Sequence, residues 1–108
     1  MTIHKITELY FKSFQSKNID FFRKNLCNDV KLIDWEVNLE GIEKVLDNME
    51  YTFNYFKTIE INSLKIDCIH NISFSEFSIR LDNLQLEVID RINFDDDRKI
   101  KSIRAFKG

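Results

Sequence analysis

The segment Leu84–Phe94, LQLEVIDRINF, limits what this chain can fold into more than any other stretch. Every second residue is large and apolar except for one aspartate, and the series is Leu84, Leu86, Val88, Asp90, Ile92 and Phe94. Strict alternation is typical of a strand with one buried face. It therefore predicts that the Asp90 carboxyl points into the same interior as its apolar neighbours. Because an isolated buried charge is costly, this carboxyl must be hydrogen-bonded, paired or protonated.

The composition narrows the class of protein. Of the 108 residues, 44% are hydrophobic and 31% are charged, which is typical of one globular domain spanning residues 1–108. The formal net charge is −2 and both signs are interspersed, so we expect no basic face for a nucleic acid. No apolar run is long enough for a membrane span or for the core of a signal peptide. We therefore expect a cytoplasmic protein that contacts neither nucleic acid nor membrane.

Metal and disulfide chemistry have little support in the sequence. Cys27 and Cys68 lack the spacing of a metal site, and without a secretory signal we expect two reduced thiols rather than a disulfide. His4 and His70 are isolated in the sequence. The acidic turn at residues 95–97 lacks the glycine and the distal glutamate of a calcium loop. The residues therefore imply no metal ion and no organic cofactor.

The chain begins with helical periodicity. The stretch Ile3–Gln15 predicts a helix with Thr2 as its N-cap. Its apolar stripe includes Ile6, Tyr10 and Phe14. Tyr10 is open to two interpretations. It is either a plain core aromatic or a residue whose buried hydroxyl is held inside the fold by a polar partner.

Two further helices are predicted in the first half. Residues 18–26 form a short one, which a turn at residues 28–29 ends. Residues 38–56 form the longest one, with Gly41 relieving its first turn. The apolar stripe of this long helix consists of Ile42, Val45, Leu46, Met49, Phe53 and Phe56.

A strand is predicted between these two helices, at residues 30–37. Its alternation places Val30, Leu32 and Asp34 on one face. Asp34 is thus a second carboxylate in phase with apolar residues. The alternative is that Asp34 is a strand-end residue that reaches solvent.

From residue 58 onward the apolar residues alternate with period two. The in-phase sets shift by one residue twice, first between Ile61 and Leu64 and again between Phe74 and Phe77. Such a shift is typical of a β-bulge, which bends a sheet. The strands are separated by predicted turns at residues 70–71, 82–83 and 95–98.

The order of elements is therefore helix, helix, strand, helix and four strands in hairpin succession. It predicts an α+β fold in which three N-terminal helices pack on a strongly curved, mostly antiparallel sheet that encloses a pocket. Four segments resemble the NTF2-like superfamily, the cone-shaped fold that SnoaL-like cyclases and ketosteroid isomerase share. They are ITELYFKSFQSKNIDFF, NDVKLID, EGIEKVLDNM and VIDRINFDDDRKIKSIRAF. The resemblance covers essentially the whole chain.

Three polar candidates resemble the catalytic set of ketosteroid isomerase, where an Asp base works with an oxyanion hole of a Tyr and a protonated Asp. Tyr10 matches the tyrosine of the first helix, Asp34 the base at the end of the first strand, and Asp90 the protonated aspartate of the penultimate strand. The resemblance implies catalytic roles for all three. For the pocket we expect the lining residues Phe14, Trp35, Met49, Phe53, Val88 and Ile92.

The chain also departs from that enzyme. Trp35 follows the candidate base where the isomerase has a proline. Leu46 stands near the position of the tyrosine that supports the oxyanion tyrosine. Glu36, Glu76 and His70 are further polar candidates for the pocket.

Two kinds of function follow. In the first, the protein is an acid/base enzyme acting on a small, largely apolar ketone: Asp34 moves a proton next to the carbonyl, while Tyr10 and neutral Asp90 stabilise the enolate. A related dehydratase or cyclase would use the same pocket. In the second, the protein is a non-catalytic module that binds a small ligand, dimerises, or binds a partner as nuclear transport factor 2 does.

Two physical expectations accompany these functions. Desolvation by Val88 and Ile92 should raise the pKa of Asp90 and keep it protonated near neutral pH. This carboxyl should share a hydrogen bond with Tyr10 or lie close to it. Outward apolar side chains on the last strands should form a patch that favours a homodimer through the outer sheet face. The residues expected in that patch are Ile89, Ile103 and Ala105.

Overall fold

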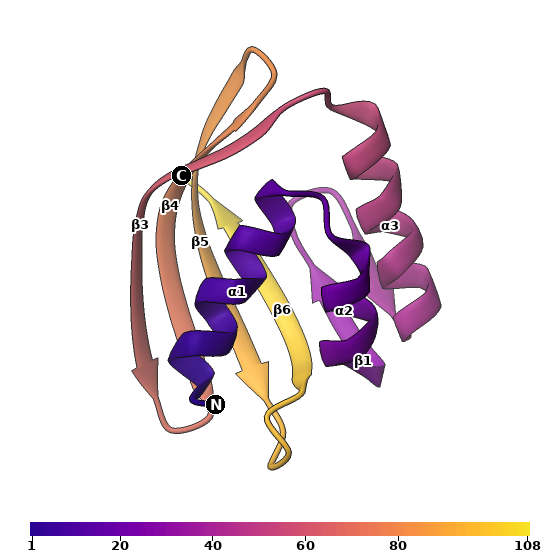
Figure 1. Ribbon diagram of the computed structural model, residues 1–108, viewed down its shortest axis with the longest axis vertical. Helices are drawn as coiled ribbons and strands as arrows, with labels where there is room; N and C mark the ends of the chain where they lie inside the picture. Colours follow the sequence, from indigo (N-terminus) through magenta and orange to yellow (C-terminus); the bar gives the residue numbers. More distant parts are fainter.

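The computed structural model describes residues 1–108 as three helices on one six-stranded sheet. The elements are α1 (Ile3–Gln15), α2 (Ile19–Asn25), β1 (Leu26–Ile33), β2 (Asn38–Glu40), α3 (Ile42–Tyr55), β3 (Ile59–Ile69), β4 (Ile72–Leu81), β5 (Leu84–Phe94) and β6 (Ile100–Lys107). The sheet order is β2-β1-β6-β5-β4-β3, and all pairs are antiparallel except β1 with β6. The helices lie on one side of the curved sheet (Figure 1). The predicted α+β architecture is confirmed.

Helix α1 forms where its apolar stripe predicts. The Thr2 Oγ1 accepts a hydrogen bond of 3.1 Å from the Lys5 backbone N–H, which satisfies one of the free amides at the helix start. The buried face of α1 directs Ile6, Tyr10 and Phe11 toward the sheet. This helix crosses in front of the central strands (Figure 1) and so covers the middle of the interior.

The segment between α2 and α3 differs from the prediction. β1 runs through residues 28–29, where a turn was expected, and a register shift against β6 absorbs these polar residues. β1 then ends at Ile33, and residues 38–40 form the short strand β2 instead of the first helical turn. The helix begins only after Gly41, whose φ of 102° is accessible mainly to glycine. Three strand residues are too few to display a period of two beside a long helical stripe.

Strand β3 contains the first predicted bulge. Its pairing with β4 shifts register between Asn62 and Lys65, and Ser63 adopts a φ of 56°. Because of this extra residue, Ile61 and Leu64 both pack against the core although they are three positions apart. The bulge therefore keeps the apolar side chains of β3 turned toward the helices.

The second predicted bulge is wrong, because β4 pairs with β5 over its whole length without a register shift. Ile72 and Phe74 instead lie on the outer face, and the buried inward positions are taken by Ser73 and Ser75. The Thr7 hydroxyl of α1 donates to the Ile3 carbonyl at 2.7 Å, and its oxygen accepts a hydrogen bond of 2.9 Å from the Ser73 hydroxyl. The small serines leave room for α1 over this part of the sheet, so the apolar residues change face without a bulge.

The outer sheet face also differs from the prediction. Ile89 is 45% exposed as expected, but Ile103 is buried and Ala105 faces the interior. The register explains this, since Ala105 is directly opposite Asp90, and Ile103 is directly opposite Ile92. The exposed apolar residues on the outer face, which we call the outer patch, are Ile69, Phe74, Ile89 and Phe106.

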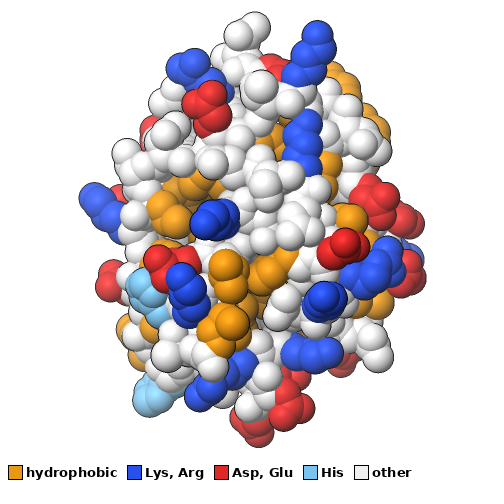
Figure 2. Space-filling model, viewed as in Figure 1, with side chains coloured by type: hydrophobic (Ala, Val, Ile, Leu, Met, Phe, Trp, Pro, Cys, Tyr) orange, Lys and Arg blue, Asp and Glu red, His pale blue; other side chains and the backbone are white.

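The helix-bearing face shows charged side chains of both signs scattered among polar and apolar ones, without a basic cluster (Figure 2). None of the three helices has the length and apolar character needed to cross a membrane. Cys27 and Cys68 are free thiols, as the sequence predicted.

Candidate functional site

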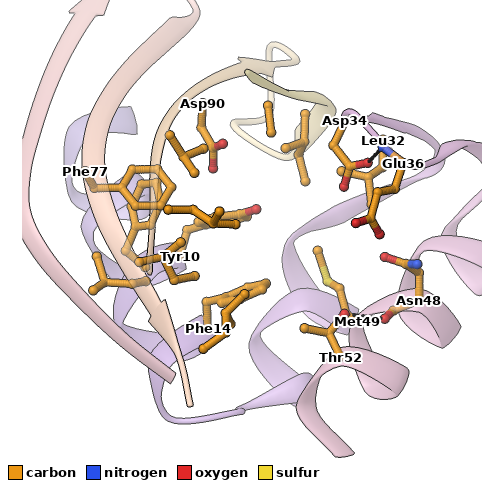
Figure 3. Close-up of a pocket in the computed structure, with 18 of the residues that line it drawn as sticks. Tyr10, Phe14, Leu32, Asp34, Glu36, Asn48, Met49, Thr52, Phe77 and Asp90 are labelled. Carbon is orange, nitrogen blue, oxygen red and sulfur yellow. Dashed lines mark hydrogen bonds between the residues drawn. The ribbon is translucent and has the colours of Figure 1, made fainter. Parts of the chain in front are cut away.

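A cavity of about 220 Å³ lies between α1, α3 and the inner face of the sheet. Fifteen of its twenty lining residues are hydrophobic. The polar lining residues are Asp34, Glu36, Asn48, Thr52 and Asp90. Ligand pockets are commonly apolar with a few polar groups that fix orientation, and this cavity has that character (Figure 3).

The structure brings the three candidate catalytic residues to this cavity. Tyr10 comes from α1, Asp34 follows the last residue of β1, and Asp90 lies on β5. Figure 3 shows the Tyr10 hydroxyl and the carboxyls of Asp34 and Asp90 directed into the same space. The placement of these three groups does not by itself determine their chemical role.

Most of the expected lining residues are also present. Phe14, Trp35, Met49 and Val88 line the cavity. Phe53 and Ile92 do not; both lie in the hydrophobic core, and Ile92 is fully buried. The period of a helix or strand identifies the inward face, but it does not separate core positions from cavity positions on that face.

Asp90 occupies a place in the sheet where its neighbours are small. The residues directly across from it are Ser75 on β4 and Ala105 on β6. Asp90 is only 5% exposed, yet its carboxyl has no hydrogen-bond partner in the protein. The Ser75 Oγ is likewise buried without a partner. The short side chains on both sides leave the cavity space above this carboxyl open.

Tyr10 is held by aromatic packing. Its ring contacts Phe11 and Phe22 edge to face, with centroid distances of 5.0 and 5.2 Å, and stacks on Phe14 at 6.4 Å. The residue is 5% exposed, and its hydroxyl has no hydrogen-bond partner in the protein. Packing therefore fixes the ring while the hydroxyl remains available inside the cavity.

The electrostatics of this region favour protonated groups. Burial, together with the negative charge of Asp34, raises the pKa of Asp90 from 3.8 to about 7. Burial and the charges of Asp90 and Asp34 also raise the pKa of Tyr10 well above its ordinary value of 10.0. Tyr10 is thus a hydrogen-bond donor at neutral pH, and so is Asp90 in its protonated form.

Asp34 sits in a different environment, the tight turn between β1 and β2. Its Oδ1 accepts hydrogen bonds from the backbone N–H groups of Glu36 at 2.7 Å and Val37 at 2.8 Å. Its own N–H donates to the Val37 carbonyl at 3.0 Å. The turn therefore orients the carboxylate and leaves Oδ2 without a protein partner at the cavity wall.

The sequence did not single out two of the polar lining residues, Asn48 and Thr52. They stand one turn apart on α3, and the Thr52 hydroxyl donates to the Asn48 carbonyl at 3.1 Å. Each precedes a residue of the apolar stripe, and this flanking position was the available signal. Of the further candidates, Glu36 lines the cavity, whereas Glu76 faces outward. His70 is exposed in the β3–β4 turn.

Known structures share this fold. No family model and no curated protein matches the sequence. An NTF2-like protein of unknown function from Cytophaga hutchinsonii has a TM-score of 0.85 at 14% identity, covering 100% of this chain and 91% of the other. A proposed polyketide cyclase from Pseudomonas putida gives 0.85 at 15%, covering 100% and 92%. A proposed SnoaL-like isomerase from Agrobacterium tumefaciens gives 0.81 at 14%, covering 100% and 99%.

The chain therefore has the NTF2-like fold, as the sequence predicted. The structure thus combines the NTF2-like fold with a largely apolar cavity of about 220 Å³. Because this fold carries many different activities, the particular function has to be argued from the cavity itself.

Proposed function

We propose that the protein is a cofactor-independent acid/base enzyme, similar to ketosteroid isomerase, that moves a proton next to the carbonyl of a small apolar ketone. The observation that carries this proposal is the pair Tyr10 and Asp90, two buried polar groups that face one cavity without a protein partner. Buried polar groups are almost always hydrogen-bonded. These two are therefore available to a bound molecule or to water.

The proposed reaction needs only these two donors and one base. The Asp34 carboxylate takes the proton from the carbon next to the carbonyl, and the electrons of that C–H bond form the enolate. The enolate oxygen accepts hydrogen bonds from the Tyr10 hydroxyl and from protonated Asp90. Asp34 then returns the proton to another carbon, so the double bond moves and the atoms balance without a cofactor.

The surroundings of Tyr10 support its role as a direct donor. Leu46, which replaces the supporting tyrosine of the isomerase, is fully buried in the core and cannot donate or accept a hydrogen bond. The Tyr10 hydroxyl thus has no competing side chain. Its raised pKa keeps the proton in place at neutral pH.

Isomerisation of cyclohex-3-en-1-one to cyclohex-2-en-1-one, followed by the absorbance of the conjugated product, tests the proposal. Asp34→Asn should lower kcat/KM by about 10²–10⁴-fold, the usual loss of a general base. Asp90→Ala and Tyr10→Phe should each lower it by about 10²-fold or more. Asp29→Asn is the matched control, because Asp29 is exposed on β1, the strand that leads into the Asp34 turn, and does not line the cavity.

A second candidate function is non-catalytic binding of a small ligand. It is favoured by the two backbone hydrogen bonds to Asp34, which account for this aspartate as a turn residue without any chemistry. Binding of 4-propylphenol, whose hydroxyl can pair with Tyr10 and Asp90, separates the two functions. Tight binding without turnover of the ketone would support the binding module, and turnover that is lost in Asp34→Asn would support the enzyme.

A homodimer through the outer sheet face remains our proposal for the assembly. The outer patch supports it, because Ile89 and Phe106 are cross-strand neighbours and Phe74 lies diagonally beside them. Exposed apolar side chains that form one patch favour a protein contact. Light scattering at micromolar concentration should give the mass of a dimer for the native chain and of a monomer for Ile89→Glu. A native monomer would contradict the proposal.

A further inference from the structure

The polar residues of the cavity form two groups with opposite hydrogen-bonding character. Tyr10 and Asp90 lie on one side and form what we call the donor end. The acceptor end lies across the cavity (Figure 3), and it consists of Asp34, Glu36, Asn48 and Thr52. The rest of the lining is hydrophobic, so a ligand that spans the cavity meets polar groups at its two ends.

The acceptor end takes its character from local hydrogen bonds. The Thr52 hydroxyl already donates its proton to the Asn48 carbonyl, so its oxygen can only accept from a ligand. In Asp34, Oδ1 is occupied by the turn and Oδ2 has no protein partner. The Glu36 carboxylate has no protein partner either. The Asn48 side-chain amide offers an acceptor oxygen as well as N–H donors. A ligand group that donates hydrogens can therefore pair with each of these four residues.

The charges at the cavity have one sign. Asp34 and Glu36 contribute carboxylates, and no lysine, arginine or histidine is among the twenty lining residues. A cavity lined by one sign of charge attracts the opposite charge and rejects its own. The cavity thus discriminates against a carboxylate ligand and in favour of a cation.

An ammonium group already lies beside one of the lining residues. The Lys107 Nζ is 5.7 Å from the centroid of the Trp35 ring, which also lines the cavity. This is within the range of a cation–π contact. Lys107 is exposed and has no salt bridge, so it can return to water when a ligand arrives. The ring of Trp35, next to the carboxylate of Glu36, is thus a surface that accepts a positive charge.

We infer that the ligand is a small one-ring molecule with an oxygen at one end, which accepts from Tyr10 and Asp90, and a protonated amine at the other, bound by Glu36 and Trp35. This inference rests on the proposed use of the cavity as a ligand site, and it holds with or without turnover. The volume of about 220 Å³ sets the size, since pockets for drug-sized ligands usually measure about 300–1,000 Å³.

Three phenols of equal length test the charge preference. Tyramine ends in an ammonium, 4-propylphenol ends in a methyl group in the same place, and 4-hydroxyphenylacetate ends in a carboxylate. Titration calorimetry at neutral pH should show tyramine binding about five- to tenfold more tightly than 4-propylphenol. The carboxylate should bind most weakly.

Variants of the acceptor end locate the effect. Glu36→Gln should remove most of the advantage of tyramine while leaving the affinity for 4-propylphenol unchanged. Glu40→Gln is the control, because Glu40 is exposed on β2 and does not line the cavity. Lys107→Met should increase the affinity for tyramine, because it removes the competing ammonium from Trp35.

The outcomes separate this inference from the proposed site. If 4-propylphenol binds as tightly as tyramine, or the carboxylate binds most tightly, the amine inference is overturned and the site stands. If none of the three phenols binds, the site and the inference both fail. Asp90→Ala should weaken all three alike, since it changes the end that they share.

Discussion

Two aspartates face the same cavity from opposite sides, and their environments differ in one decisive respect. Asp90 lies within a continuous strand, where every backbone amide nearby is used by the sheet and none is left for the carboxyl. Asp34 lies in a turn, where two backbone N–H groups point at its Oδ1. Burial without a donor favours the neutral acid at Asp90. The two donated hydrogen bonds at Asp34 fix the orientation of its carboxyl. The two residues are of the same type, so the difference between their environments comes from the local backbone.

Asp90→Asn removes the titratable carboxyl at the buried position. Of the variants considered, it should change the pH dependence of the unfolding free energy most. The shift in the Asp90 pKa from 3.8 to about 7 corresponds to at most about 4 kcal/mol. A raised pKa in the folded state stabilises the fold fully below the unfolded value, and the contribution is lost as pH rises through the folded value. Relative to Asp90→Asn, the wild type should lose up to about 4 kcal/mol of unfolding free energy between about pH 4 and pH 8.

Urea denaturation at a series of pH values measures this loss. Asp67→Asn, on the exposed face of β3, is the control and should keep the pH dependence of the wild type. Parallel pH profiles for the wild type and Asp90→Asn would show that Asp90 is not desolvated in solution.

Asp34→Ala tests the role of the second aspartate in the turn. It removes the acceptor of two backbone hydrogen bonds, and we expect a loss of about 1–2 kcal/mol in the unfolding free energy at neutral pH. Asp34→Asn keeps an acceptor oxygen and should lose less than about 1 kcal/mol. Urea denaturation of both variants at one pH gives the comparison. Equal losses would mean that the turn does not depend on the oxygen.

Asp34→Asn also tests the electrostatic coupling between Asp34 and Asp90. The charge of Asp34 is the second cause of the raised pKa of Asp90, after burial. We therefore expect the pKa of Asp90 to fall below about 7 while remaining above its ordinary value. A carbon-13 NMR titration of the Asp90 carboxyl measures it, with Asp29→Asn as the control. An unchanged pKa would separate the two carboxyls electrostatically.

Tyr10→Phe should have the smallest effect on stability. The hydroxyl has no partner in the protein, so the unfolding free energy should change by less than about 1 kcal/mol. The affinity for 4-propylphenol should nevertheless fall by about five- to tenfold, because a donor to the ligand is lost. Denaturation and calorimetry on the same sample check both statements. A large loss of stability would reveal a hidden structural partner of the hydroxyl.

The sequence was sufficient for the parts of the fold that depend on a single element. The helical stripe placed Tyr10 inside, and the alternation of β5 placed Asp90 on the buried face. The shift of phase between Ile61 and Leu64 located a bulge. In each case the pattern lies within one segment, and which face of that segment is buried follows from the alternation of apolar and polar residues.

The predictions that were wrong concern residues whose position depends on packing or pairing with another helix or strand. Phe74 and Ser75 exchanged faces because α1 needs room over β4, which the sequence of β4 does not state. Ile103 was assigned to the wrong face because the phase of β6 is set by its pairing with β5. Asn48 and Thr52 line the cavity from the flank of the apolar stripe of α3, and a flanking position alone does not separate a cavity wall from solvent.

Ala105 has a consequence for how this cavity could change over time. It faces the cavity directly opposite Asp90 and contributes only a methyl group to the wall. A larger side chain at this position would shorten the space beside the donor end while leaving every hydrogen-bonding group in place. The size of the accepted molecule and the chemistry of its two ends are thus encoded at different positions. A descendant of this protein could adopt a shorter or longer ligand through one wall residue and keep the same recognition of its oxygen.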